Sequence, residues 1–426
     1  MSRSHVLEAG EAEFAELLFE VLSPSRPLQS EELLRGRSEQ LRGIETALYA
    51  PGRHVLIHGL RGVGKSSLAH TAAYKLSRGG DPVIVGCDSS STFGSIVKEL
   101  YEEMVGKHPS IREEIKKRGF SMGPAWLRAE AASETTVDAP DEPLSVNNAV
   151  RLIEVLVEKQ GGTPVFVVDE FDQITSKTSQ KEFTNLIKQV ADKYVNARFI
   201  FCGIGESVEA IMSAHGSADR YFHAVELGQL PWEARDEIVV NAAKALGIHI
   251  DRETNIRIAM ISDGFPHYIH LLAEKLFLAV YRANNAGRVT PELFDQAMEE
   301  TARSMDMKLR GPYEKATEKY GDSYAAILWA AADGHQLKRP SKHIYESYKR
   351  IQLERGVDPL PRDKFSQYIN RLKKPSHGEI LTGSRQGWYE YTEKMIRGYV
   401  RLKAELNSVR LQSDHPLSRS LNALHG

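Results

Sequence analysis

A glycine-rich segment near residue 60 has the residue types and spacing that bind phosphate. Its eight residues, Gly59-Leu60-Arg61-Gly62-Val63-Gly64-Lys65-Ser66, match the pattern G-x-x-x-x-G-K-[ST] at every position. Glycines let backbone N–H groups approach phosphate oxygens, and a helix that starts at Lys65 adds the positive end of its dipole. The Lys65 ammonium suits the β- and γ-phosphates, and the Ser66 hydroxyl suits Mg²⁺. We therefore predict a nucleoside-triphosphate site whose residues are Gly59, Arg61, Gly62, Val63, Gly64, Lys65, Ser66 and Ser67.

Two adjacent carboxylates end a short apolar segment further along the chain. Asp169 and Glu170 follow Val165–Val168 directly, and such an apolar run is typical of a buried strand. Beside a phosphate-binding loop, Asp169 is expected to hold Mg²⁺ and Glu170 to orient and polarise the attacking water. The pair therefore indicates hydrolysis of ATP rather than binding alone. Asp172 is expected to be a solvated acid at a helix start rather than a third catalytic carboxylate.

Both motifs need a strand before them, and the sequence supplies strands that alternate with helices. Apolar runs this short predict a parallel sheet covered on both faces, hence an α/β, three-layer P-loop NTPase fold. The predicted strands are 54–58, 82–87, 164–168, 198–202 and 223–227, and the predicted helices include 65–77, 93–104, 146–160, 179–194 and 208–213.

The chain of 426 residues is long enough for two to four domains. After residue 231 the strand pattern ends, and 232–304 is predicted to form four helices. Residues 107–145 are expected to be an irregular insertion. The predicted organisation is an N-terminal helix and linker (1–30), a nucleotide-binding core (31–230), a helical lid (231–310), a C-terminal domain (320–411) and a flexible tail (412–426).

Four further segments resemble those of known ATPases. The segment 34–41 resembles the "GRE-x-x-L" motif that contacts the adenine side, and 201–207 lies where the first sensor strand ends. The segment 219–222 precedes the last strand, and 263–269 resembles the "G-x-P" start of a second-sensor helix. With the phosphate loop and the acidic pair, the chain resembles the AAA+ superfamily. More narrowly, it resembles the origin-recognition/cell-division-cycle initiator ATPases and the related STAND-type signalling ATPases.

The resemblance implies roles for three more residues. Arg37 would contact the nucleotide. Arg220 would be a catalytic arginine finger given to a neighbouring subunit, so hydrolysis would require a homo-oligomer. His267 would take the second-sensor position. The alternatives are a surface or ion-paired arginine at Arg220, and a packed or capping histidine at His267.

The chain departs from the family pattern at both sensors. The first sensor is usually a polar Asn, Ser or Thr, whereas this strand ends in Cys202-Gly203, which leaves Ser207 as a weaker candidate. The second sensor is usually an arginine, whereas this chain has His267. A histidine contact to a phosphate would depend on pH near the ordinary histidine pKa.

The C-terminal part is predicted to have three helices, a hairpin and a final helix, which resembles a winged helix. In a DNA-binding winged helix the third helix enters the major groove. The alternative is a protein-docking module whose charges are a solvated face. The predicted contacts to double-stranded DNA are Arg362, Lys364, Gln367, Arg371, Lys373, Lys374 and, on the wing, Arg385.

Charge and cysteine content agree with this organisation. The net charge of −2 hides a net of +7 for residues 321–410 and −9 for the remainder, which favours an anionic partner for the basic part. The two cysteines, Cys87 and Cys202, exclude a disulfide framework. This low cysteine content makes a reducing cytoplasm the expected location. No apolar run reaches the roughly 18 residues of a membrane span.

The leading hypothesis is an ATP- and Mg²⁺-dependent switch that oligomerises on DNA. The second is a signalling or anti-phage defence ATPase that acts through an effector protein. A third, weaker hypothesis is a chaperone-like loader that remodels a partner.

Overall fold

The computed structural model describes residues 6–77, 80–119, 124–131, 142–205, 218–318, 321–384 and 386–411. The chain divides into two compact units. The first comprises Met1–Arg26, Arg61–Val63 and Gln229–Gly426, and the second comprises Pro27–Leu60 and Gly64–Gly228.

The second unit is built on a five-stranded parallel sheet with the order β2-β3-β4-β1-β5. Parallel strands all end at the same edge, so the segments that follow them meet there. The strands are β1 (His54–Gly59), β2 (Val83–Gly86), β3 (Val165–Asp169), β4 (Arg198–Gly203) and β5 (Phe222–Leu227).

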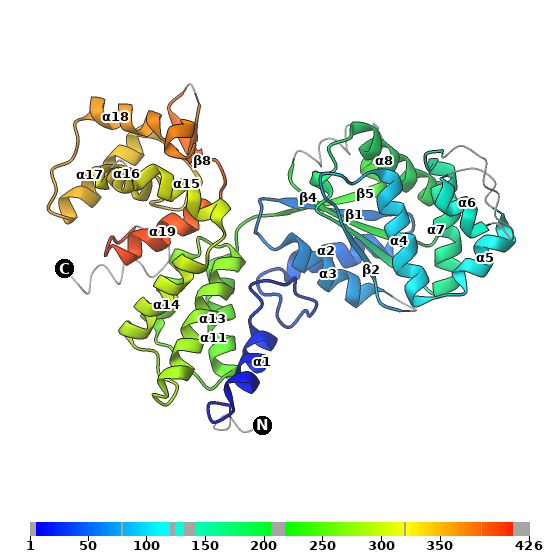
Figure 1. Ribbon diagram of the computed structural model, residues 1–426, viewed down its shortest axis with the longest axis horizontal. Coiled ribbons are helices and arrows are strands. Elements are labelled where there is room, and N and C mark those ends of the chain that lie inside the picture. The colour runs from blue at the N-terminus through cyan, green and yellow to red at the C-terminus, as the bar shows by residue number, and fades with distance from the viewer. Residues whose placement is uncertain are drawn as a thin grey trace. The chain divides into compact units, whose positions relative to one another are not determined.

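Helices cover both faces of this sheet, as predicted (Figure 1). One face carries α2 (Ser38–Tyr49) and α3 (Lys65–Leu76). The other carries α4 (Phe93–Lys107), α7 (Val146–Gln160) and α8 (Lys177–Asp192) over a continuous buried core. Aromatic rings fill that core and contact one another at centroid distances of 5.0 to 6.0 Å; they include Phe93, Phe166, Phe171, Phe183, Phe199 and Phe201. The predicted three-layer α/β fold is therefore confirmed.

The expectation of an irregular segment at 107–145 is wrong for part of it. Helices α5 (Ile111–Arg118) and α6 (Ala125–Ala131) form there. Ile115 and Leu127 are fully buried in the core on the α4 side, and burial of these few apolar side chains stabilises helices that are otherwise charged. The predicted helix at 208–213 lies outside the described residues.

The first unit contains a helical bundle and the N-terminal helix α1 (Glu11–Val21). Four helices form where four were predicted. The Phe14 ring stacks on Tyr281 at 4.2 Å, which packs α1 against the bundle. Among the described residues, no helix has both the length and the hydropathy needed to cross a bilayer. The bundle helices are α11 (Trp232–Ala245), α12 (Arg252–Ile261), α13 (Pro266–Ala283) and α14 (Pro291–Ser304).

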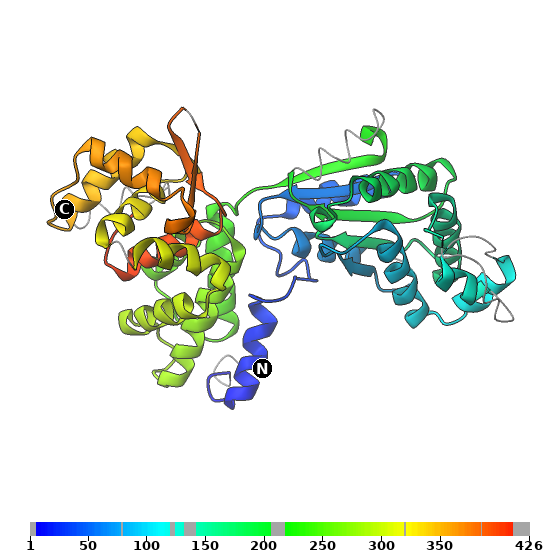
Figure 2. The same ribbon diagram turned by 45° about the horizontal axis from the view of Figure 1, so that its top comes forward.

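The same unit continues into the C-terminal helices and a small antiparallel sheet with the order β6-β8-β7. Figure 2 shows the β7–β8 hairpin (orange) projecting from the helices around it. The elements are α15 (Met307–Thr317), α16 (Asp322–Ala331), β6 (Lys338–Pro340), α17 (Ser341–Glu354), α18 (Arg362–Arg371), β7 (Leu381–Gly383), β8 (Trp388–Tyr391) and α19 (Ile396–Leu406).

A buried ion pair joins the bundle to these C-terminal elements. The Arg397 Nη1 atom on α19 lies 2.6 and 2.5 Å from the two carboxylate oxygens of Asp263, and Arg397 has no exposed surface. Its Nη2 atom donates to the carbonyls of Ala332 and Gly334. A buried charge is tolerated only when it is paired and hydrogen-bonded in this way.

Candidate nucleotide-binding site

The predicted phosphate loop joins β1 to α3, and its backbone requires glycine at three positions. Gly62 and Gly64 have φ angles of 77° and 94°, in the left-handed region that favours glycine. A Cβ atom on Gly59 would lie 2.1 Å from the carbonyl oxygen of Leu227 on β5. Helix α3 begins at Lys65, so its free N–H groups and positive dipole end face the loop.

Lys65 lies inside the loop that it closes. Its Nζ atom donates to the carbonyls of Gly59 and Leu60 at 3.2 and 2.9 Å. Burial leaves the pKa of Lys65 below its ordinary value. The surrounding acidic groups, among which Asp172 has the largest influence, oppose this shift but do not cancel it. Asp172 lies in the first turn of the short helix η1 (Phe171–Gln173), where its side chain is half-buried and raises the pKa of Lys65. A negatively charged phosphate would replace the loop carbonyls as the partner of Lys65.

Asp169 ends β3 and faces α3, and the Glu170 N–H, the Ser66 hydroxyl and the His70 ring surround its carboxylate. The Glu170 N–H donates to Oδ1 at 2.8 Å, and the His70 Nε2 atom lies 3.7 Å from Oδ2. Burial raises the pKa of Asp169, but the nearby His70 ring, the Ser66 hydroxyl and the Glu170 backbone N–H together outweigh burial and leave the pKa below its ordinary value. Asp169 is therefore ionised and held beside the Ser66 hydroxyl, as a cation ligand would have to be.

Glu170 has the exposure expected of a group that activates water. Its side chain is exposed, and its backbone has φ 52° and ψ 36°, an unusual conformation for a residue other than glycine. Strained backbone of this kind is concentrated at functional sites. With this backbone conformation the Glu170 side chain is exposed, whereas that of the preceding residue, Asp169, is half-buried.

Cys202 occupies the place of the usual polar sensor. It is fully buried in β4, between the strands that carry Asp169 and the phosphate loop. Burial raises the pKa of the Cys202 thiol well above its ordinary value, and the neighbouring Asp169 carboxylate adds to this. The thiol is thus a neutral neighbour of Asp169. Ser207, the other candidate sensor, lies outside the described residues.

The donors present fit a magnesium ion. Mg²⁺ is commonly held by one or two oxygen ligands from the protein together with phosphates and water, and Ser66 and Asp169 supply a hydroxyl and a carboxylate. Within the described ranges, no three His, Cys, Asp or Glu side chains converge to form an all-protein metal site. Ser66 and Asp169 would therefore hold a cation that arrives with the nucleotide.

Arg37, Arg220 and His267, the three residues whose roles come from the family resemblance, differ in burial and in hydrogen-bond partners. Arg37 is buried, donates to the Gly228 carbonyl at 2.5 Å, and has a pKa that burial lowers to about 10. Arg220 is exposed on the short helix α10 (Ala218–Tyr221). His267, in the first turn of α13, lies with Nδ1 3.0 Å from the Pro24 carbonyl. This contact places a proton on Nδ1, so His267 would donate to a phosphate from Nε2 only as an imidazolium.

The contacts of Ser67 and His70 differ from what the sequence predicts for these two residues. The Ser67 hydroxyl, predicted to bind nucleotide, accepts a hydrogen bond from the backbone N–H of Leu28 at 3.1 Å. His70 was not predicted to act, yet it lies beside Asp169. The signal was its spacing: it follows Ser66 by four residues, so both lie on one face of α3.

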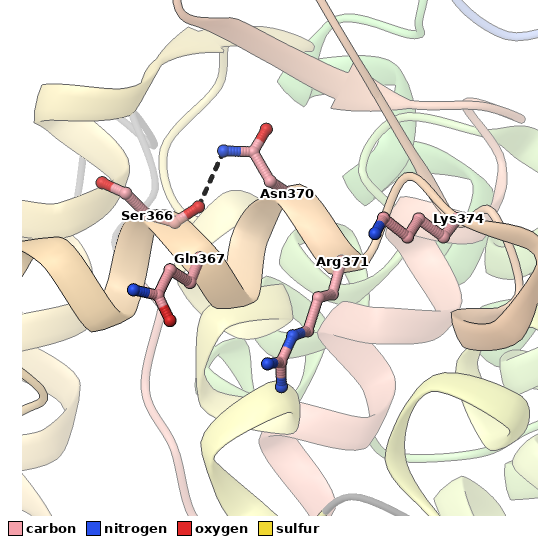
Figure 3. A pocket seen from close by; sticks show the side chains of 5 residues that line it. All are labelled: Ser366, Gln367, Asn370, Arg371 and Lys374. Atoms are coloured by element: carbon pink, nitrogen blue, oxygen red, sulfur yellow. Dashed lines mark hydrogen bonds between the residues drawn. The ribbon is translucent and has the colours of Figure 1, made fainter.

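The predicted DNA-contacting residues fall into two groups. Figure 3 shows three members of the first group, Gln367, Arg371 and Lys374. Lys364, Gln367, Arg371 and Lys374 are exposed along one side of α18 and the turn after it, and the last three line a surface hollow of about 390 Å³ with Ser366 and Asn370. Arg371 also donates to the Tyr324 hydroxyl at 3.3 Å.

In the second group, Arg362 and Lys373 contact other side chains or backbone of their own unit. The Arg362 guanidinium donates to the Ser341 carbonyl and hydroxyl at 2.9 and 2.8 Å. The Lys373 amine lies 5.6 Å from the centre of the Tyr389 ring. Arg385 lies outside the described residues.

Several solved structures are similar to this chain at low sequence identity. A Walker-type ATPase of Pyrococcus abyssi has a TM-score of 0.51 and 17% identity, over 88% of this chain and 98% of its own. Cdc6p from Pyrobaculum aerophilum has a TM-score of 0.44 and 18% identity, over 91% and 98%. The ORC2 protein of Aeropyrum pernix, in its ADP form, has a TM-score of 0.46 and 12% identity, over 91% and 98%.

Sequence comparison identifies the domain itself. No curated protein matches the chain. Residues 33–199, which include the phosphate loop and the acidic pair, match the AAA ATPase domain family. These residues therefore form an AAA ATPase domain, and the protein is an ATPase.

Proposed function

We propose that the protein is a Mg²⁺-dependent ATPase switch that oligomerises and associates with DNA through its C-terminal domain. The observation that carries the proposal is the strand pairing that brings Asp169, at the end of β3, to the same sheet edge as the phosphate loop after β1. Lys65 neutralises the β- and γ-phosphates, and Ser66 and Asp169 hold the cation. Glu170 orients the attacking water and accepts its proton.

The oligomeric part of the proposal rests on Arg220. This arginine is exposed on the short helix that comes just before β5. An arginine that reaches the nucleotide of a neighbouring subunit would stabilise charge on the transferring phosphoryl group. Assembly would then switch hydrolysis on.

The DNA part rests on the C-terminal elements. The order α16, β6, α17, α18, β7, β8 is the order of a winged helix, in which α18 is the groove-binding helix. Phe365 and Ile369 are buried on the inner side of α18. The exposed outer side carries Lys364, Gln367 and Arg371, which could contact DNA. Cations on one helix side, with a polar amide between them, suit phosphates flanking a base edge.

One observation favours the second candidate, a signalling or defence ATPase with an effector partner. The Arg362 guanidinium is bound within its own domain by Ser341, so it is not freely offered to phosphates. In that case the C-terminal domain would dock a protein. Duplex binding separates the two candidates.

The catalytic assignment predicts that Glu170→Gln lowers ATP turnover by about 10²- to 10⁴-fold, because an amide cannot accept the proton of water. Nucleotide affinity stays at the wild-type value, because Lys65 and the loop are intact. Steady-state turnover and fluorescent-nucleotide binding measure the two effects. Glu113→Gln, an exposed glutamate of α5, is the matched control. Turnover equal to wild type in Glu170→Gln would remove Glu170 as the base.

The finger assignment predicts that Arg220→Ala lowers turnover by about 10³-fold or more. Arg53→Ala, another exposed arginine of the same unit, leaves turnover unchanged. Mixing Arg220→Ala with Glu170→Gln restores activity, because each variant supplies the group that the other lacks at a shared interface. Failure of the mixture to exceed either variant alone would contradict a finger acting between subunits.

The DNA assignment predicts that wild-type protein binds duplex DNA with an affinity that falls steeply with salt. Lys364→Ala with Lys374→Ala weakens binding and lowers the slope of log affinity against log salt by about 2, because each lysine releases about one counterion. Lys244→Ala with Lys308→Ala removes equal charge from exposed positions elsewhere in the unit and leaves the slope unchanged. Fluorescence anisotropy measures both. Absence of wild-type binding at low salt would favour the protein-docking candidate.

A further inference from the structure

His70 stands out among the titratable side chains of the described residues because nothing in the predicted chemistry uses it. It lies on α3 one helical turn after Ser66, which places both side chains over the end of β3. Its side chain is 13% exposed, and the Asp169 side chain opposite is 14% exposed. The side chains of His70 and Asp169 are therefore both largely buried, whereas the neighbouring Glu170 side chain is exposed.

The buried Nε2 atom of His70 lacks a hydrogen bond within the part of the chain that the structure describes. It is buried and has no hydrogen-bond partner within ordinary distance among the described residues. It faces the Asp169 Oδ2 atom at 3.7 Å, slightly beyond a hydrogen bond. A buried polar atom without a partner costs free energy, so a group left in this state is expected to gain its partner in another state of the site.

We propose that His70 is a positioning residue for the cation site and that it fixes the Asp169 carboxylate when the nucleotide and its cation bind. The proposal rests on the proposed role of Asp169 as a cation ligand. The Glu170 N–H holds Oδ1 from one side, and His70 holds Oδ2 from the other. Carboxylates that bind metals depend on such outer partners, whose loss typically weakens metal affinity by 10- to 100-fold.

The test measures metal binding rather than turnover. Full-length wild-type protein, His70→Ala and His70→Gln are titrated with Mn²⁺ in the presence of ATP, and free Mn²⁺ is followed by electron paramagnetic resonance. ATP affinity is measured separately in EDTA. The Gln amide nitrogen lies near the position of Nε2 and should restore the contact. His108→Gln, at the C-terminal end of α4, controls for loss of a half-buried histidine from the same unit.

The expected result is that His70→Ala weakens Mn²⁺ binding at least about tenfold, while ATP affinity in EDTA is unchanged and His70→Gln recovers most of the loss. Wild-type Mn²⁺ affinity in His70→Ala would overturn the proposal. So would an equal loss of metal-free and metal-dependent binding in both variants, because that pattern shows a packing role. Failure of wild-type protein to bind Mn²⁺ with ATP would instead overturn the cation-binding function itself.

Discussion

The parallel pairing of five strands is the constraint on which the site depends. Hydrogen bonding of β3 to β4 and of β4 to β1 brings their carboxyl ends to one edge, although the residues there are far apart in sequence. The phosphate loop leaves that edge after β1, and Asp169 ends β3. Cys202 on β4 lies between them. The site is therefore a consequence of strand order, and substitutions that preserve the sheet preserve the relative positions of its groups.

A second constraint acts inside the first unit. The Asp263 carboxylate, in the turn before α13, is enclosed by Arg397 and Arg401 of α19. Loss of one partner would leave a buried charge unpaired, at a cost of about 3 to 5 kcal/mol. The turn that presents His267 is thus tied to the last helix of the C-terminal elements, and the bundle and those elements form one compact unit.

Sequence patterns predict a functional group reliably when one short segment contains both the backbone conformation and the side chains that the chemistry needs. The phosphate loop and Val165–Glu170 are such segments, and their strands follow from apolar runs too short for helices. His70 and Cys202 were not assigned because their closeness to Asp169 comes from packing of separate elements. The spacing of His70 from Ser66 indicates only that the two share one face of α3. Helices α5 and α6 were missed because a few buried apolar residues stabilise a charged segment. The basic total of residues 321–410 counts Arg397 and Arg401, which are buried and serve the ion pair rather than a surface.

The central claim is that the carboxyl edge of this sheet forms one site for ATP with its cation. Titration calorimetry of ATP into the full-length protein, with Mg²⁺ and with EDTA, tests it most directly when wild type is compared with Lys65→Ala. The account predicts that wild type binds one ATP per chain and binds it more tightly with Mg²⁺. It also predicts that Lys65→Ala loses the tight binding, because the Lys65 ammonium is the group that neutralises the β- and γ-phosphates. Equal ATP affinity in the two proteins would contradict the account.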